Sequence, residues 1–317
     1  MQYWLRWYPA YIEIEITNRC NMRCVMCEHT YWDEPPRDMS FDEFKYIVDQ
    51  FPRLTWIGLT GIGESFLNKD FIKMLSYVKA KGIITEIYDT FYFVDKEIAN
   101  KLIELKIDSI YASIDAATKE TYEKIRPGSN FEKVIKNVSY FLDLRRRYPI
   151  PLTKFNFHYI VSKLNLNEIL DHLKLVSSIS KGLSLGVQFT RLLHNYPQVK
   201  DIYVEIPKSI IEESIRKGKE LNIEVTWNAN TLDPKPTPRN CIEWTMPFIF
   251  VSGEVIPCCA ANEKNRRQFQ KEYSMGNIFK QSFREIWRGK RYRILLNSLA
   301  KDILPLVCKD CCLYEEK

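Results

Sequence analysis

The chain has 317 residues, of which 45% are hydrophobic, and it carries 46 basic against 40 acidic side chains for a net charge of +6. At about 150 residues per domain, this length predicts two domains or one larger α/β unit with an appendage, and the hydrophobic content excludes a largely disordered chain. The small net charge does not require a nucleic-acid partner, although it would not repel an anionic substrate.

Strand-like and helix-like segments alternate through the first two thirds of the chain. Residues 11–16 alternate apolar and acidic side chains, which predicts a strand with one wet face. Ser40 and Glu43 have capping-box spacing at the start of a predicted helix over 40–50. Further strands are predicted at 54–60, 83–88, 107–114, 152–161 and 183–190, and further helices at 70–81, 95–106, 118–126, 131–148 and 167–180. Such units form a parallel sheet with covering helices and place ligand chemistry at the carboxyl ends of the strands.

The composition changes after about residue 230. Residues 233–239 are rich in proline and cannot continue a helix, so we expect one domain over 1–230 and a second over 231–317. Within the second domain, 248–251 and 254–257 predict a hairpin joined by two residues, and 281–299 predicts a helix.

No secretory signal and no apolar run of about 20 residues are visible, so we expect a cytoplasmic protein without a membrane association. In a reducing compartment, grouped cysteines favour metal ligation over disulfides. Cys20, Cys24 and Cys27 supply three thiolates, one fewer than a closed site takes, and so leave one coordination position open. The alternatives are a zinc knuckle completed by His29, or buried cysteines acting as small apolar residues.

These residues resemble the radical SAM superfamily. Its CxxxCxxC signature matches the three cysteines, and its glycine-rich acidic motif resembles Gly61-Ile62-Gly63-Glu64. The resemblance implies a partial (β/α)6 barrel in the α/β class that binds S-adenosylmethionine and a 4Fe–4S cluster. It also implies reductive cleavage to methionine and a 5′-deoxyadenosyl radical.

The resemblance assigns further residues to S-adenosylmethionine. Gly61, Gly63 and Glu64 are expected at its amino end, because glycines permit close backbone approach and a carboxylate pairs with an ammonium group. Contacts from strand ends and the following helix are expected from Ser113, Asp115, Arg126 and Gln188. Met26 and Ser65 depart from the family pattern, which usually has an aromatic residue and a proline there.

The second cysteine set resembles a twitch or SPASM extension. Four ligands, Cys241, Cys258, Cys308 and Cys311, would saturate an auxiliary 4Fe–4S cluster. Too few cysteines remain for a second auxiliary cluster, so the shorter twitch form fits better; a zinc ribbon is the alternative. Cys259 and Cys312 are left over, as catalytic hydrogen donors or as buried thiols.

Similarity to aminocyclitol dehydrogenase-type members implies hydrogen abstraction from a small polar sugar-, cyclitol- or nucleotide-like substrate, followed by dehydrogenation or epimerisation. His158, Gln188 and Arg191 are candidate polar groups for that chemistry. The first alternative is a peptide maturase of SPASM type, and the second is a non-enzymatic iron–sulfur or zinc protein that binds nucleic acid.

A reducing partner such as flavodoxin or ferredoxin is expected to be acidic and to dock on basic side chains near the auxiliary site. The candidates for that surface are Arg239, Lys264, Arg266, Arg267 and the run 288–293.

Overall fold

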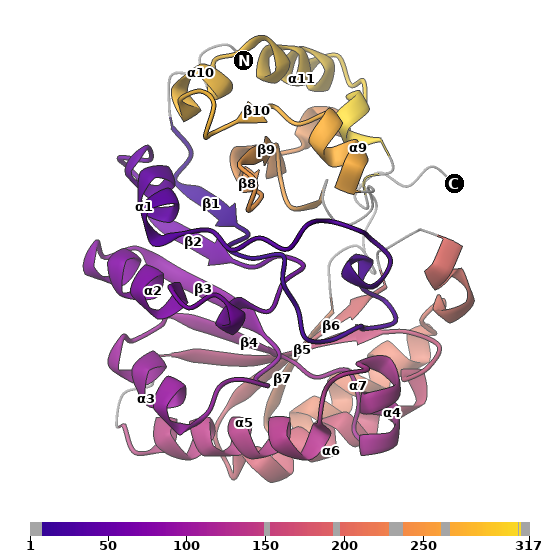
Figure 1. Ribbon diagram of the computed structural model, residues 1–317. Helices are drawn as coiled ribbons and strands as arrows, with labels where there is room; N and C mark the ends of the chain where they lie inside the picture. The colour runs from indigo at the N-terminus through magenta and orange to yellow at the C-terminus, as the bar shows by residue number, and fades with distance from the viewer. Residues whose placement is uncertain are drawn as a thin grey trace.

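The computed structural model describes residues 8–148, 153–192, 197–227, 237–260, 267–309 and 311. Seven parallel strands occur in chain order, each but the last followed by helices (Figure 1). The strands are β1 (Tyr11–Ile14), β2 (Trp56–Leu59), β3 (Ile84–Asp89), β4 (Ser109–Ser113), β5 (Lys154–Val161), β6 (Leu185–Arg191) and β7 (Ile223–Trp227). The helices are α1 (Phe41–Asp49), α2 (Phe71–Ala80), α3 (Lys96–Glu104), α4 (Lys119–Ile125), α5 (Phe131–Arg146), α6 (Ile169–Ser180) and α7 (Lys208–Glu220). This order confirms the partial (β/α)6 barrel and adds α7 and β7, which the sequence patterns did not reveal.

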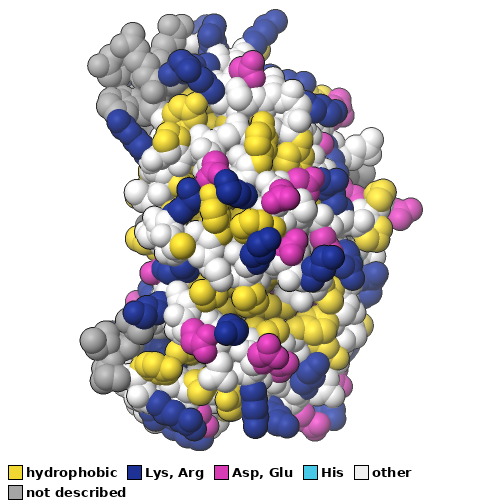
Figure 2. Space-filling model, turned by 60° about the vertical axis from the view of Figure 1, so that its left-hand side comes forward, with side chains coloured by type: hydrophobic (Ala, Val, Ile, Leu, Met, Phe, Trp, Pro, Cys, Tyr) yellow, Lys and Arg dark blue, Asp and Glu magenta, His cyan; other side chains and the backbone are white. Residues whose placement is uncertain are grey.

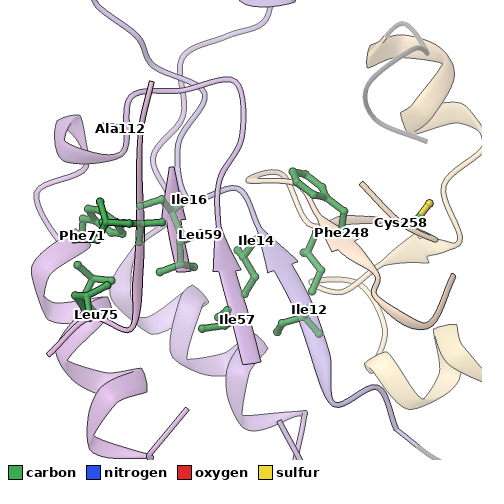
Figure 3. Close-up of a cluster of buried hydrophobic side chains, with 14 of the residues drawn as sticks. Ile12, Ile14, Ile16, Ile57, Leu59, Phe71, Leu75, Ala112, Phe248 and Cys258 are labelled. Atoms are coloured by element: carbon green, nitrogen blue, oxygen red, sulfur yellow. The ribbon is translucent and has the colours of Figure 1, made fainter. Parts of the chain in front are cut away.

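The acidic face of β1 differs from its prediction. Glu13 and Glu15 do not face solvent: only 9% of Glu13 and 0% of Glu15 are exposed. The expected wet face is the inside of the barrel, because the alternation of a strand separates two faces without saying which one meets water. On the other face, Ile12 and Ile14 pack against Ile57 of β2, as Figure 3 shows.

The C-terminal segment extends the same sheet. Strand β8 (Phe248–Ile249) pairs in parallel with β1, and β9 (Glu254–Ile256) and β10 (Gly276–Asn277) follow as antiparallel strands. The sheet therefore has ten strands in the order β10-β9-β8-β1-β2-β3-β4-β5-β6-β7. The expected boundary at 230/231 lies outside the described residues.

Two local predictions in this segment need correction. Phe250 N–H donates to the Glu254 carbonyl at 2.9 Å, so three residues rather than two close the hairpin, with Gly253 at φ +90°. A type I turn followed by a left-handed glycine is the usual three-residue solution. The helix expected over 281–299 is two helices, α10 (Phe283–Trp287) and α11 (Lys290–Ala300), because the chain breaks at Gly289.

A short helix, α9 (Arg267–Glu272), lies beside this hairpin in Figure 1. Arg267 was expected in a basic docking surface, but it is 2% exposed and paired with Glu15. Lys264 and Arg266 lie outside the described residues. Figure 2 shows the face carrying α1–α3, where basic and acidic side chains are interspersed. Among the described helices, none combines the length and apolarity needed to cross a bilayer.

Candidate active site

A cavity of about 400 Å³ opens at the carboxyl ends of the barrel strands. Its wall contains all three cysteines of the first set, the glycine-rich loop after β2, and the ends of β3–β6. The predicted residues in this wall are Cys20, Cys24, Cys27, Gly61, Gly63, Glu64, Ser113, Arg126, His158, Gln188, Arg191 and Cys259. The structure thus brings together groups that are up to 239 residues apart, the separation of Cys20 and Cys259.

The three cysteines lie on a loop that α4 holds in place. Val25 N–H donates to the Ile125 carbonyl at 2.9 Å, and Arg23 N–H donates to the Pro127 carbonyl at 2.8 Å. Burial raises the pKa of Cys20 to about 11, and burial also raises the pKa of Cys24. The free thiols therefore keep their protons at neutral pH, and binding of an iron cluster would displace these protons.

His29 does not join these cysteines as a fourth ligand. Its Nδ1 lies 3.2 Å from the Arg23 guanidinium, and burial lowers its pKa. Within the described residues, no three His, Cys, Asp or Glu side chains converge to hold a single metal ion.

The glycines after β2 allow this loop to approach the chain that leads to the cysteines. A Cβ on Gly63 would lie 2.2 Å from the Thr17 carbonyl oxygen, and one on Gly61 would lie 2.5 Å from the Glu15 side chain. Glu64 N–H donates to the Arg19 carbonyl at 2.8 Å. Any other residue at 61 or 63 would push the two loops apart.

Glu64 is the group that best fits the amino end of S-adenosylmethionine. Only 2% of Glu64 is exposed, and its Oε2 accepts a hydrogen bond from the Thr90 hydroxyl at 2.6 Å. Its Oε1 is buried with no hydrogen-bond partner among the described residues. A buried carboxylate oxygen is costly to leave unpaired, and an ammonium group would satisfy it.

Asp89, at the end of β3, is a neighbour of Glu64 that the sequence patterns did not single out. Burial, followed by the negative charge of Glu64, raises the pKa of Asp89 well above its usual range. This direction favours the protonated form of Asp89 and disfavours two adjacent buried negative charges in the site. The position of Asp89 at a strand end, next to the glycine-rich loop, is the one signal that could have indicated it as a site residue.

Ser113, His158 and Gln188 are neighbours because of strand register. Ser113 pairs with His158 across β4 and β5, and His158 pairs with Gln188 across β5 and β6. His158 Nε2 lies 3.1 Å from the Thr190 hydroxyl, and burial lowers the pKa of His158 to about 4. The imidazole is therefore neutral at physiological pH.

Arg126 and Asp115 form a buried pair beside the cysteine loop. The Arg126 guanidinium donates to Asp115 Oδ2 at 2.7 Å through Nε, and Ile160 N–H donates to Asp115 Oδ1 at 2.7 Å. Both oxygens of Asp115 are thus engaged, and Asp115 is not part of the cavity wall. The structure places Asp115 behind Arg126, whose Nη1 lies 3.9 Å from the Cys24 sulfur. Asp115 orients Arg126 and does not itself reach the cavity.

Another part of the cavity wall comes from β1, β3 and the C-terminal segment. Glu13, Tyr88, Phe248 and Cys259 all line it. Cys258 instead is 5% exposed and belongs to the hydrophobic core, as Figure 3 shows. The adjacent cysteines therefore point to different environments, as expected for neighbours on an extended chain. Glu13 and Tyr88 were not predicted, because a charged or aromatic residue inside a strand does not reveal the interior of a barrel.

Three of the four proposed auxiliary ligands, Cys241, Cys308 and Cys311, lie near one another in the C-terminal segment. Burial, followed by the nearby Cys311 and Cys241, raises the pKa of Cys308 to about 12. Cys311 N–H donates to the Cys308 carbonyl at 3.0 Å, which closes a tight turn around the CxxC pair. Cys258 lies close enough to Tyr292 to raise the pKa of its phenol, after burial as the main cause. Cys312 lies outside the described residues.

Comparison with known proteins agrees with this geometry. The sequence model of the Radical SAM superfamily matches residues 14–176, and that of SPASM, an iron–sulfur cluster-binding domain, matches 241–312. The tungsten-containing aldehyde ferredoxin oxidoreductase cofactor-modifying protein of Pyrococcus furiosus is 29% identical over 326 residues, covering 96% of this chain and 88% of that protein.

Two further relatives were found. The AdoMet-dependent heme synthase of Methanosarcina barkeri is 25% identical and covers 89% of this chain and 82% of that protein. The crystal structure of Streptococcus suis SuiB bound to S-adenosylmethionine superposes with a TM-score of 0.71 at 13% identity, over 92% of this chain and 68% of that one. The likeness to SuiB shows a shared fold.

Proposed function

This chain belongs to the radical SAM superfamily and carries a C-terminal SPASM domain, and on that basis we propose that it abstracts a hydrogen atom from a small polar molecule. The observation that carries the proposal is that one cavity is lined by the three cysteines and Glu64 together with Glu13, Tyr88 and Cys259. S-adenosylmethionine bound there supplies a 5′-deoxyadenosyl radical, which removes hydrogen from a substrate C–H bond.

The chain's own residues have separate tasks in this proposal. Glu64 holds the methionyl ammonium group, and Arg126 presents its charge beside the cysteine loop. Glu13 is placed to accept the proton that a carbinol loses when its carbon radical is oxidised to a carbonyl. Cys241, Cys258, Cys308 and Cys311 would hold the auxiliary cluster, which would supply a one-electron acceptor for this oxidation. His158 is a weak proton acceptor, because burial lowers its pKa to about 4.

Cys259 offers the alternative outcome of epimerisation. Its thiol hydrogen would transfer to the substrate radical, and the sulfur radical would then need one electron and one proton to be restored. The electron would come from the external one-electron donor that radical SAM enzymes need, which we propose to be a flavodoxin or ferredoxin. Dehydrogenation and epimerisation thus differ in whether Cys259 is consumed in each turnover.

The size of the cavity and the names of the relatives both favour a small, cofactor-like or nucleotide-like substrate. A cavity of about 400 Å³ that also takes part of S-adenosylmethionine leaves room for a small molecule or one side chain. By their names, the Pyrococcus relative modifies a cofactor and the Methanosarcina relative synthesises heme. A cofactor-like or nucleotide-like molecule is therefore the first substrate class to test, ahead of a peptide.

The test is release of 5′-deoxyadenosine by the anaerobically reconstituted enzyme. The reconstituted enzyme should contain about eight iron per chain. With dithionite as reductant, small polar compounds and nucleotides should raise the rate of 5′-deoxyadenosine release. Deuterium placed at the reacting carbon of the substrate should appear in the released 5′-deoxyadenosine. The Cys20→Ala variant should release none, and Cys259→Ala should retain release but lose any product epimerised at the reacting carbon. Stimulation by peptides alone would overturn the proposal in favour of peptide maturation, and zinc without iron would overturn the enzyme assignment.

Glu64→Gln tests the cofactor part separately. The loss of one charge-assisted hydrogen bond should raise the KM for S-adenosylmethionine about tenfold or more. Glu97→Gln, the same change on the exposed side of α3, should leave this KM unchanged. An unchanged KM in Glu64→Gln would remove Glu64 from the cofactor site.

A further inference from the structure

We propose that Arg267, on α9 of the SPASM domain, is a positioning residue for S-adenosylmethionine binding in the barrel, acting through Glu15. The two side chains form an ion pair inside the protein, where 2% of Arg267 and 0% of Glu15 are exposed. This inference rests on the cofactor of the family and not on the identity of the substrate.

Glu15 connects three parts of the molecule through its two carboxylate oxygens. Its Oε2 accepts a hydrogen bond from Ile62 N–H at 3.3 Å, in the middle of the glycine-rich loop. Its Oε1 accepts one from Val251 N–H at 3.3 Å, in the C-terminal hairpin, and also pairs with Arg267. The side chain of Glu15 packs so closely on Gly61 that a Cβ there would lie 2.5 Å away. The position of the loop that carries Glu64 is therefore set by the position of the Glu15 carboxylate.

Arg267 in turn fixes the Glu15 carboxylate from the other domain. Its guanidinium lies 3.9 Å from the centre of the Phe250 ring, and its Nε is 3.3 Å from Glu34 Oε1. These contacts hold the guanidinium plane, so that Nη2 meets Glu15 Oε1 in one orientation. A residue of the SPASM domain thus determines the geometry of a loop in the barrel.

The same guanidinium also reaches the segment that follows the cysteine loop. Glu34 lies in this segment. It forms an ion pair with Lys271 of α9 at 2.6 Å and accepts a hydrogen bond from the Asn18 side-chain amide at 3.3 Å. Asn18 stands two residues before Cys20 in the chain. Arg267 therefore reaches the glycine-rich loop through Glu15, whereas Lys271, which is paired with Glu34, stands outside this route.

Loss of Arg267 should disturb the glycine-rich loop more than it disturbs the overall fold. An unpaired carboxylate in this interior is unfavourable, so Glu15 would turn toward water or take up a proton, and either change weakens its hold on Ile62. Glu64 N–H would keep its bond to Arg19, but the loop would no longer be fixed at both ends. The ammonium site would then be formed for only part of the time, which reduces apparent affinity by the fraction that is formed.

The test compares Arg267→Met with Lys271→Met, a matched change on the same helix that leaves Glu15 paired. Without S-adenosylmethionine, amide hydrogen exchange at 61–64 should become about tenfold faster in Arg267→Met and stay unchanged in Lys271→Met. With the cofactor and dithionite but no substrate, the KM for S-adenosylmethionine should rise about tenfold while the kcat for 5′-deoxyadenosine release changes little. Arg267→Lys should fall between Arg267→Met and the wild type.

Two measurements keep the outcome interpretable. Iron content and cooperative unfolding report whether each variant is folded, and Glu15→Gln, which keeps the side-chain shape, should reproduce both effects if Arg267→Met does not fold. The inference is overturned if folded Arg267→Met or Glu15→Gln shows wild-type exchange at 61–64 and a wild-type KM. It is also overturned if Lys271→Met shows the same changes as Arg267→Met. These assays need no substrate, so failure of the substrate proposal would leave their result unaffected.

Discussion

Asp115 and Arg126 illustrate how single residues of this site depend on pairing. Asp115 is 0% exposed and Arg126 is 6% exposed, and each has the other as its charged partner. A buried pair of this kind contributes little net stability relative to apolar residues, but removal of one partner leaves an uncompensated charge. The stability lost on substitution of one partner therefore reflects the burial of the remaining charge more than the attraction between the two side chains.

Asp115→Asn should consequently destabilise the protein by about 3–5 kcal/mol in anaerobic denaturant unfolding. The matched control is Asp143→Asn, which breaks an exposed pair with Arg146 and should cost no more than about 1 kcal/mol. Equal losses in the two variants would show that Asp115 is not the buried anchor of Arg126.

His172 gives the protein a pH-dependent stability. Burial lowers its pKa from 6.5 to about 4, and its Nδ1 lies 3.3 Å from the Ala116 carbonyl oxygen. The unfolded chain therefore takes up a proton between pH 6.5 and 4 while the folded chain does not, and stability falls as the pH falls through this window.

Between pH 7 and 5, this single group should reduce the free energy of unfolding by about 2 kcal/mol. His172→Phe, in a pocket already lined by Tyr159 and Phe189, removes the titration and should lose correspondingly less stability over the same range. Subtracting the two unfolding curves cancels the acid sensitivity of the clusters. Parallel curves would contradict a buried neutral imidazole at this position.

At the scale of elements, the hairpin of β8 and β9 presents Cys258 to the C-terminal core and Cys259 to the cavity. Gly253 permits its three-residue turn, because φ is +90° and a Cβ there would lie 2.4 Å from the Phe279 ring. Two separate physical requirements, a left-handed backbone and close packing, thus meet at one residue.

Gly253→Ala and Gly182→Ala separate these requirements. Gly182 has a similar φ of +88° but nothing within 4 Å of its Cβ position. Both variants should lose about 1 kcal/mol to the backbone conformation. Gly253→Ala should lose more and should also bind less auxiliary iron, as measured by iron content after reconstitution. Equal stabilities would mean that the contact with Phe279 relaxes without cost.

At the scale of the whole molecule, the ten-stranded sheet joins the two sequence regions into one structure. Strand β8 covers the edge of β1, where Phe248 pairs with Glu13 and Ile249 pairs with Ile14. Arg37 Nε–H donates to the Val251 carbonyl at 2.9 Å. Removal of the C-terminal segment would expose a parallel strand edge and its apolar face to water, which favours aggregation.

A fragment of residues 1–236 should therefore aggregate or unfold without cooperativity, measured by gel filtration and denaturant titration. Coexpression with a fragment of residues 237–317 should restore a soluble complex. A monomeric 1–236 fragment with a cooperative transition would show instead that the barrel is an independent domain.

The sequence by itself determined the family and the order of the first six strands with the helices between them. Hydrophobic period and capping signals are local properties, so the helix starting at Ser40 and the alternating strands were predictable. The three closely spaced cysteines and the loop 61–64 were recognisable for the same reason, since both motifs are contiguous in the chain.

Tertiary structure alone decided which groups face the cavity and which are buried behind it. Glu13 and Glu15 share one strand pattern, yet one lines the cavity and the other anchors a loop through a residue 252 positions away. Asp115 is likewise defined by Arg126 at the end of α4, and Asp89 by Glu64 in the loop after β2. Burial, pairing and pKa depend on neighbours distant in sequence, and parallel strand register is what makes those residues neighbours.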